Sequence, residues 1–108
     1  MTRSRGRRDA NHTELVRFAE RLGFSVSCVA DLPGELDLIV GLYGIDLRVE
    51  IKDGTLPRSR RTLTEDEEKL FREWKGRPPV IWKSPADVME TRDALLAESQ
   101  EEATVRRK

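Results

Sequence analysis

The sequence has few of the features that a membrane protein or a disulfide-stapled domain requires. Cysteine occurs once, at Cys28, so no internal disulfide can form, and its position in an apolar run predicts a buried thiol. No apolar run approaches the roughly 20 residues of a membrane span. The basic N-terminus lacks the apolar segment of a secretory signal. We therefore expect a cytoplasmic protein that does not associate with membranes.

Net charge is also absent, because 20 acidic residues balance 20 basic ones in a chain of 108. The distribution of charge is more informative, since separate basic patches can hold a polyanion on a neutral protein. Basic residues gather at both ends and in the middle: Arg3, Arg5, Arg7, Arg8, Arg58, Arg60, Arg61, Arg106, Arg107 and Lys108. The length suits one domain. We predict a basic disordered arm over 1–8, a domain over 9–98 and a charged tail over 99–108.

Hydrophobic periodicity and turn residues predict the order α-β-β-β-α-β-α, and hence an α/β fold. The predicted elements are helices over 11–22, 64–75 and 85–98, and strands over 24–30, 36–42, 45–52 and 79–82. Leu15, Phe18 and Leu22 recur at helical spacing in the first helix. Ser84 followed by Pro85 is typical of an N-cap and a first helical position, so the third helix begins there.

The two central strands form a predicted hairpin whose register is specified by its aliphatic residues. Folding the chain at Tyr43-Gly44 gathers them on one face, as the pairs Leu42 with Ile45, Val40 with Leu47, Leu38 with Val49 and Leu36 with Ile51. A slip of one residue would scatter these side chains over both faces. The same register places Asp37 directly opposite Glu50, and Lys52 shares their face because strand side chains alternate.

Two opposed carboxylates, about 4.5–5.5 Å apart at Cβ, repel each other and favour a cation between them. Mg²⁺ suits such a site, because it takes one or two carboxylates together with water and substrate phosphate. Lys52 could hold the attacking water or the phosphate oxygens, so the pattern indicates phosphodiester hydrolysis. The alternative is a solvated sheet face on which Lys52 or Arg48 neutralises the acids.

Asp37 followed by Glu50-Ile51-Lys52 resembles the signature of the PD-(D/E)XK nuclease superfamily. The longer string from Val49 to Gly76, VEIKDGTLPRSRRTLTEDEEKLFREWKG, closely resembles the small phage-type VRR-NUC domain nucleases. In these an E-(V/I)-K strand precedes a basic loop, a Leu-Thr helix start and a helix ending near Trp-Lys-Gly. The resemblance covers residues 9–94 and implies a restriction-endonuclease-like core, with a mixed central sheet flanked by helices.

The resemblance also implies roles for individual residues. It implies metal-binding carboxylates at Asp37 and Glu50, a metal-binding backbone carbonyl at Ile51, a catalytic lysine at Lys52 and an additional acid near the metal at Glu14. The sequence departs from the family pattern at two positions. Leu36 replaces the proline that usually precedes the aspartate, and Glu67 stands where the family usually has glutamine.

Glu67 and Glu14 have structural explanations as well. Thr64-x-x-Glu67 is a capping-box sequence, and Asn11-x-x-Glu14 can likewise cap the first helix. Glu67 nevertheless shares a helical face with apolar residues that must dock on the protein, so it could overlook the sheet as a further catalytic acid.

The remaining polar and aromatic candidates concern nucleic-acid binding. A basic loop leaves the sheet directly after Lys52, so we expect a phosphate track lined by Arg58, Arg60, Arg61, Lys75 and Arg77. A solvated loop is the alternative. We expect His12 at the surface without a catalytic role, and Trp74 and Trp82 in the core.

The sequence therefore predicts a Mg²⁺-dependent DNA endonuclease, with Mn²⁺ as a substitute metal. The resemblance implies selectivity for branched DNA, such as a four-way (Holliday) junction. A DNA-binding module without turnover and a protein-interaction domain are the alternatives. We also predict a homodimer, because apolar residues near the C-terminus exceed what so small a domain can obviously cover. These residues are Val80, Ile81, Trp82, Val88, Met89, Leu95 and Leu96.

Overall fold

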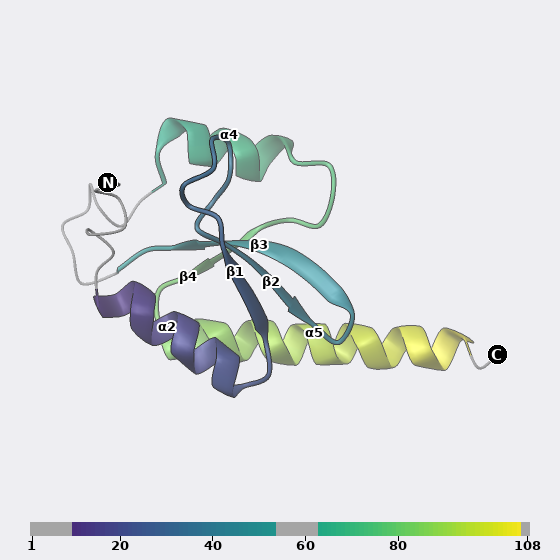
Figure 1. The fold of residues 1–108 in the computed structure, drawn as a ribbon. Helices are drawn as coiled ribbons and strands as arrows, with labels where there is room; N and C mark the ends of the chain where they lie inside the picture. Colours follow the sequence, from purple (N-terminus) through teal and green to yellow (C-terminus); the bar gives the residue numbers. More distant parts are fainter. Residues whose placement is uncertain (1–9, 54–62, 107–108) are drawn as a thin grey trace.

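The computed structural model describes residues 10–53 and 63–106. Over these residues the chain is an α/β fold of three helices and a four-stranded mixed sheet, in the predicted order α-β-β-β-α-β-α (Figure 1). The elements are α2 (Ala10–Arg21), β1 (Ser25–Cys28), β2 (Leu38–Leu42), β3 (Ile45–Ile51), α4 (Glu65–Glu73), β4 (Val80–Trp82) and α5 (Pro85–Arg106). No helix in this part of the chain combines the length and the apolar character needed to cross a membrane.

The sheet has the strand order β1-β2-β3-β4, with β1, β2 and β3 antiparallel and β4 parallel to β3. The predicted hairpin register is confirmed over the pairs Leu42 with Ile45, Val40 with Leu47 and Leu38 with Val49. Tyr43 (φ 55°) and Gly44 (φ 79°) both take positive φ, as a tight two-residue hairpin turn requires. The sequence favours this turn because glycine adopts positive φ without strain.

The hairpin ladder ends at Leu38 and Val49, so the predicted pairing of Leu36 with Ile51 is absent from it. The carboxylate of Asp37 takes the place of the next ladder acceptor, because its Oδ2 accepts from Ile51 N at 2.8 Å. The carbonyl of Asp37 accepts instead from Val29 N at 2.9 Å. Asp37 and Glu50 are thus neighbours just past the end of the ladder, but they are not a ladder pair.

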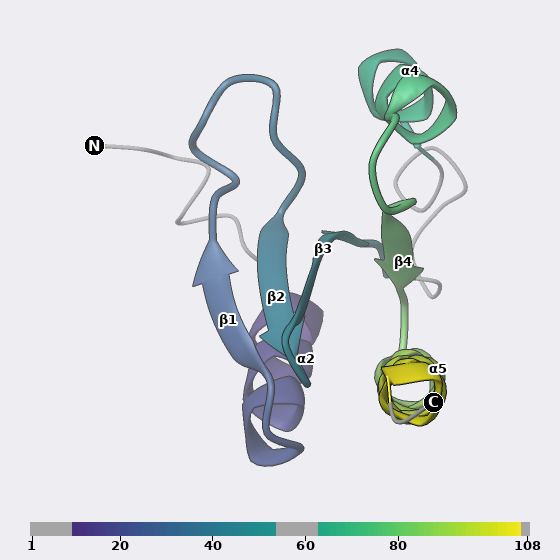
Figure 2. The ribbon, with the colours of Figure 1, turned by 90° about the vertical axis from the view of Figure 1, so that its right-hand side faces the viewer.

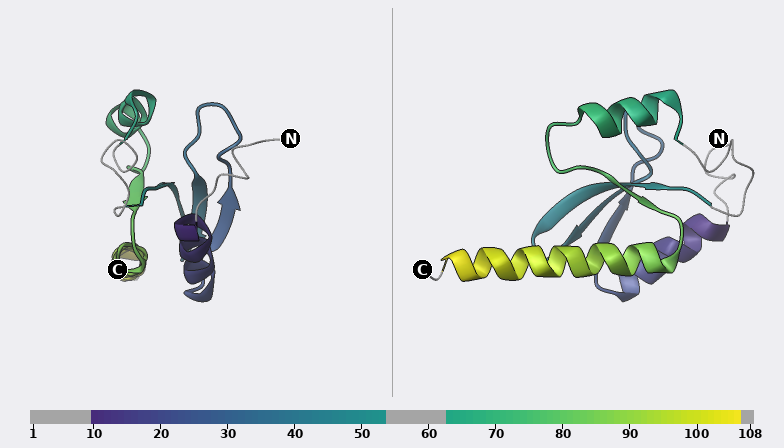
Figure 3. Two further views of the ribbon diagram at one scale, coloured as in Figure 1. Left: turned by 90° about the vertical axis from the view of Figure 1, so that its left-hand side faces the viewer. Right: turned by 180° about the vertical axis from the view of Figure 1, so that it is seen from behind.

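The helices lie on opposite faces of the sheet (Figure 3). Helices α2 and α5 lie together on one face, and α4 lies on the other. The core fills the space between the sheet and the helices α2 and α5, because side chains alternate along a strand and one set of aliphatic side chains faces these helices. It consists of Leu15, Ala19, Phe24, Leu38, Val40, Leu47, Val49, Trp82, Val88 and Leu95.

Trp82 lies in this core, as predicted. It is fully buried, and its ring meets the ring of Phe24 edge-on, with 5.5 Å between the centroids. The indole Nε1 donates to Thr91 Oγ1 on α5 at 3.0 Å, so its single polar atom is satisfied. Trp74 departs from the same prediction, since it is 40% exposed at the end of α4.

Helix α5 continues to Arg106, so the predicted end near Glu98 was wrong, and residues 99–106 of the predicted tail are helical. This segment is rich in glutamate, glutamine and alanine, which favour helix even without packing. The far half of α5 extends beyond the sheet (Figure 1), and Figure 2 shows the helix end-on beside β4.

Three further predictions are corrected by the structure. Cys28 is exposed because β1 is an edge strand, and most of its side chains face solvent. His12 is buried, only 7% exposed, because it lies on the inner side of α2. Asn11 does not cap α2, since the helix already begins at Ala10. Its side-chain Nδ2 donates to the carbonyl of Lys52 at 3.3 Å and so ties α2 to the end of β3.

Candidate functional site

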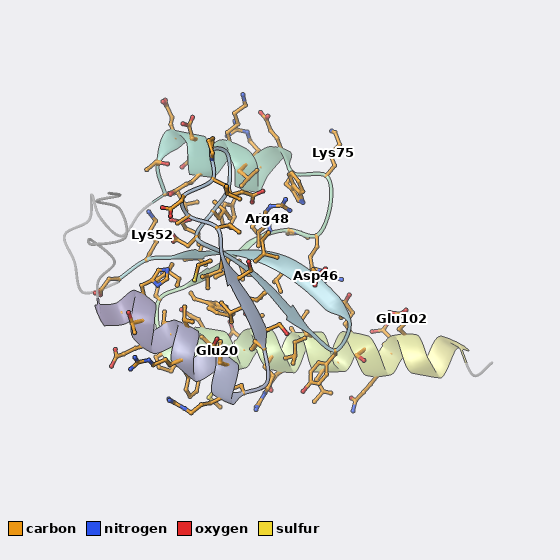
Figure 4. The ribbon with its side chains drawn as sticks, in the orientation of Figure 1. Glu20, Asp46, Arg48, Lys52, Lys75 and Glu102 are labelled. Atoms are coloured by element: carbon orange, nitrogen blue, oxygen red, sulfur yellow. The ribbon has the colours of Figure 1, made fainter. Side chains whose placement is uncertain are left out.

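The candidate site lies at the end of β3, on the sheet face beneath α4. Alternation along β3 puts Glu50 and Lys52 on this face, and the turn before β2 brings Asp37 beside them. Helix α4 supplies Glu67 from above. Figure 4 shows Lys52 at the end of the strand nearest the start of α4.

Lys52 connects the acids from the two elements. Its Nζ lies 3.5 Å from Glu50 Oε2 and 3.1 Å from Glu67 Oε1. The side chain of Lys52 is only 12% exposed, so this ammonium is largely removed from solvent. Burial by itself would lower the pKa of Lys52, but the hydrogen bond and charge of Glu67, followed by those of Glu50, raise it. The lysine is therefore firmly cationic at neutral pH.

Glu50 is the most perturbed group of the site. It is 5% exposed, and its pKa is raised from 4.5 to about 9. Burial is the largest cause, followed by a hydrogen bond with Glu67 and the negative charges of Asp37 and Glu67. Lys52 opposes this shift without cancelling it. Unless a further cation is present, Glu50 therefore holds a proton at neutral pH and donates it to Glu67.

Glu67 is both a helix cap and a member of the site. Its Oε1 accepts from Thr64 N at 2.9 Å, and Thr64 Oγ1 accepts from Glu67 N at 3.2 Å, which completes the predicted capping box. The same Oε1 pairs with Lys52. Burial would raise the pKa of Glu67, but its hydrogen bonds with Glu50, Thr64 and Lys52 lower it. Glu67 therefore caps α4, as predicted, and also overlooks the sheet, where it contacts Lys52.

The alternative of a solvated sheet face with alternating charges does not describe this site. Glu50 and Lys52 are both largely buried there. Arg48 is engaged elsewhere, because its Nε donates to Glu35 Oε1 at 2.9 Å and its guanidinium lies 3.9 Å from the ring centroid of Trp74. Lys52 does contact Glu50, so one part of that alternative, neutralisation by this lysine, is present.

The donor chemistry of the site suits a hard divalent cation. Asp37, Glu50 and Glu67 offer three carboxylates, and Lys52 offers one positive charge beside them. Within residues 10–53 and 63–106, no group of three or more His, Cys, Asp or Glu side chains is assembled as a metal cage. Mg²⁺ does not require one, because it is usually bound through one or two carboxylates plus water and substrate phosphate. Asp37 and Glu50 are the two carboxylates of the site that could serve in this way.

The other predicted residues are distributed around this cluster. Ile51 lies between Glu50 and Lys52, half-buried, with its N–H on Asp37. Glu14 is exposed on α2, and the structure gives it no part in the cluster among the described residues. Lys75 is exposed just past α4, where Figure 4 shows it pointing away from the sheet.

The basic residues predicted to line a phosphate track are only partly described. Arg77 makes a two-pronged ion pair with Glu98 of α5, with Nη1 2.9 Å from Glu98 Oε2. Its charge is therefore matched within the protein. Arg58, Arg60 and Arg61 lie outside the described residues.

A cavity lies beside the cluster, and no pattern in the sequence predicted it. Its volume is about 660 Å³, and it lies between α4 and the loop joining β1 to β2. Apolar side chains form much of its lining: Ala30, Leu32, Pro33, Leu36, Leu70 and Trp74. Glu67 also lines it, so the cavity and the charged cluster share one residue. The exposed Leu32 in a turn was the available signal, but a single exposed leucine is too common to indicate a site.

Comparison with known proteins finds no matching family model, no matching curated protein and no matching solved structure. The resemblance to the VRR-NUC nucleases therefore rests on the residues quoted above, and the function must be argued from the site itself.

Proposed function

We propose that the protein is a metal-dependent DNA endonuclease of the PD-(D/E)XK type, similar to the small VRR-NUC nucleases. The observation that carries this proposal is the cluster at the end of β3, where Lys52 contacts Glu50 and Glu67 and the charge of Asp37 acts on the buried Glu50. With Glu50 ionised, three carboxylates beside one ammonium would leave excess negative charge in a partly dry place, and a divalent cation would offset it.

Each residue has a role that follows from its position. Asp37 and Glu50 would hold Mg²⁺ or Mn²⁺, together with the backbone carbonyl of Ile51. When bound, such an ion activates water and stabilises charge on a phosphodiester. Lys52 presents an ammonium that can orient the attacking water or neutralise charge developing on the phosphate oxygens. Glu67 holds Lys52 in place and fixes the start of α4 above it.

This proposal explains the burial of Glu50 better than the two alternatives do. A protein-interaction surface has no need of a carboxylate that is 5% exposed and raised in pKa, whereas perturbed acids of this kind cluster at catalytic sites. A DNA-binding module without turnover would need the lysine but not the opposed acids. Branched DNA, such as a four-way junction, is the substrate class that we propose from the resemblance.

Cleavage assays test this proposal directly. The protein is incubated with Mg²⁺, Mn²⁺ or chelator and with labelled linear duplex, flap and four-way junction DNA. We expect metal-dependent cleavage that Glu50→Gln and Asp37→Asn abolish. Both changes keep the shape of the side chain, and asparagine still offers an acceptor to Ile51 N.

Asp46→Asn is the matched control, because Asp46 is an exposed acid on the same strand and sheet face. It should cleave at the wild-type rate. Full activity in purified Glu50→Gln or Asp37→Asn would refute the proposed site. Binding of DNA without cleavage under any metal condition would favour the module without turnover.

A further inference from the structure

The cavity beside the charged cluster has the walls of a binding site for a planar, largely apolar group. The loop joining β1 to β2 and helix α4 extend to the same side of the sheet (Figure 2), and residues of both line the cavity. Leu32 on the loop is 56% exposed and Trp74 at the end of α4 is 40% exposed, and both line the space between these elements. Two large apolar side chains facing one cavity are unusual on the open surface of a small domain.

Contacts with neighbouring residues fix the position of the Trp74 indole ring. The guanidinium of Arg48 lies 3.9 Å from its ring centroid, and Arg48 is itself held by Glu35 at 2.9 Å. Figure 4 shows Arg48 between the sheet and α4. The backbone at Gly76 packs against the ring edge so closely that a Cβ there would lie 2.8 Å from Trp74 Nε1. An aromatic ring with a locked position and an exposed surface is suited to stacking.

The charges around the cavity are mostly matched within the protein. Glu35 is paired with Arg48, Glu67 with Lys52, and Glu73 with Arg72. Among the described residues, Asp66 and Lys69, one of each sign, are the lining charges outside these pairs. The cavity is therefore better matched to a neutral ring than to a basic peptide or to a phosphate.

The cavity also adjoins the proposed catalytic site, because the two share Glu67. Glu67 lines the cavity and contacts Lys52, while Trp74 lies two helical turns further along. A rise of about 1.5 Å per residue separates the two positions by roughly 10 Å along the helix direction. With about 3.4 Å of rise per nucleotide in a stacked strand, that distance corresponds to roughly three nucleotides.

We propose that this cavity receives an unpaired nucleobase of the bound DNA, stacked on Trp74 a few nucleotides from the phosphate held at Lys52. This rests on the proposed function, because it takes DNA as the ligand. It adds a reason for selectivity: an unpaired or weakly paired base at a branch or end enters the cavity at low cost, whereas a base within a continuous duplex must first be unstacked.

The test measures DNA binding without divalent metal, so that cleavage does not occur. Fluorescence anisotropy gives the affinity for a flap oligonucleotide, and abasic sites are placed one at a time along the unpaired arm. We expect one or two abasic positions to weaken binding by about 5- to 150-fold, the range of one base–aromatic stack. Trp74→Ala should weaken binding to the intact flap by a similar factor and remove the effect of those abasic sites.

Two further variants separate stacking from support of α4. Trp74→Phe keeps an aromatic ring and should retain most of the affinity. Leu32→Ser alters the opposite wall without touching the Arg48–Trp74 contact, and it should weaken flap binding while leaving duplex binding unchanged. Tyr43→Ser is the matched control, since Tyr43 is a 43% exposed aromatic side chain at the hairpin turn and does not line the cavity, and it should bind like wild type.

The proposal would be overturned if Trp74→Ala weakened flap and duplex binding equally and no abasic site affected binding. Trp74 would then serve only to hold α4 in position. Binding of a basic peptide in the cavity that no oligonucleotide displaces would also overturn it. The failure of the proposed function has a different signature. In that case no DNA is cleaved with metal, whatever the behaviour of Trp74.

Discussion

Glu50 and Lys52 occupy largely buried positions, where charged residues are found only when they have partners of opposite charge or hydrogen-bond partners. Each lies in the last part of β3 or directly after it, largely buried under α4. A buried carboxylate is costly when ionised and stable when it holds a proton or meets a cation. The contribution of Glu50 to stability therefore depends on pH.

Replacing Glu50 by glutamine should change how stability depends on pH. The pKa of Glu50 is about 9 in the folded protein, above its ordinary value of 4.5, so between these values the folded protein binds a proton that the unfolded protein has lost. The contribution of Glu50 is complete below pH 4.5 and decreases as pH rises towards 9. The slope is at most about 1.4 kcal/mol per pH unit.

Glu50→Gln cannot titrate, so its free energy of unfolding in chelator should fall less between pH 6 and 9 than that of wild type. Urea unfolding at several pH values measures this. Glu20→Gln, an exposed acid on α2, is the control and should follow the wild-type curve. Parallel curves for Glu50→Gln and wild type would show that Glu50 is ionised in the folded protein.

Replacing Lys52 by alanine should separate binding from turnover. The ammonium is placed to act on a phosphate or a water, and loss of one such donor typically lowers turnover by about 10²–10³-fold. Single-turnover cleavage at saturating protein measures the chemical step. A rate within about twofold of wild type would mean that Lys52 only neutralises its neighbouring acids.

Helix α4 is held at the element scale by a few polar and aromatic contacts. None of its residues is buried, and it meets the sheet through Glu67 on Lys52 and through Trp74, just past its end, on Arg48. Its capping box, formed with Thr64, fixes where the helix starts. Because little apolar area is buried beneath it, the loss of a single contact should have a measurable effect on the element.

Changes at Thr64 and Glu67 distinguish the cap from the site. Thr64→Ala removes one cap acceptor and leaves the carboxylate of Glu67, so stability should fall by about 0.5–2 kcal/mol with little change in metal preference. Glu67→Gln can still accept from Thr64 N, so stability should hardly move. Its loss of charge beside Lys52 and Glu50 should shift activity or metal preference.

Thermal unfolding and cleavage across a Mg²⁺ and Mn²⁺ titration measure both effects. If the metal-dependence curve of Glu67→Gln matches that of wild type, Glu67 serves only to cap α4.

Unlike α4, helix α5 packs against the sheet through residues of the hydrophobic core. Trp82 Nε1 donates to Thr91 Oγ1 in a largely buried setting. Thr91→Val has nearly the same shape but lacks the acceptor, so the indole N–H is left unsatisfied. We expect a loss of about 1–3 kcal/mol in the free energy of unfolding. Thr13→Val, at an exposed position on α2, is the control. Equal stabilities would mean that water replaces the hydroxyl.

At the scale of the whole molecule, less apolar surface is exposed near the C-terminus than the sequence suggested. Trp82, Val88 and Leu95 were expected to contribute to a dimer interface, but each is buried in its own chain because α5 packs along the sheet. Met89 and Leu96 remain exposed, 42% and 36%, seven residues apart on one side of α5. This pair is the part of the predicted interface that stays available.

A homodimer remains a prediction at this scale. One site cuts one strand at a time, and a closed two-fold dimer would present two matching sites to a two-fold symmetric junction. Light scattering at micromolar concentration should give about twice 12.4 kDa, and Leu96→Lys should shift it towards the monomer. A monomer mass in wild type together with full junction cleavage would refute the dimer.

Local pattern determined much of this structure. Alternating aliphatic residues in β2 and β3 specified the hairpin register, and Thr64 with Glu67 specified a capping box. Alternation also put Asp37, Glu50 and Lys52 on a common face. These features depend on residues close in sequence or on a single turn, where backbone geometry leaves few choices.

Long-range packing decided the rest. Helical periodicity suggested that Glu67 could overlook the sheet, but it could not indicate the contact with Lys52. Nor could it indicate that Arg48 would turn to Glu35 and Trp74, or that the side chain of Asp37 would end the ladder at Ile51. Burial of Glu50, the origin of its raised pKa, follows from that docking and not from the strand itself. The sequence determined which chemical groups share a face, and the tertiary structure decided which of them are dehydrated and in contact, because desolvation depends on what packs above them.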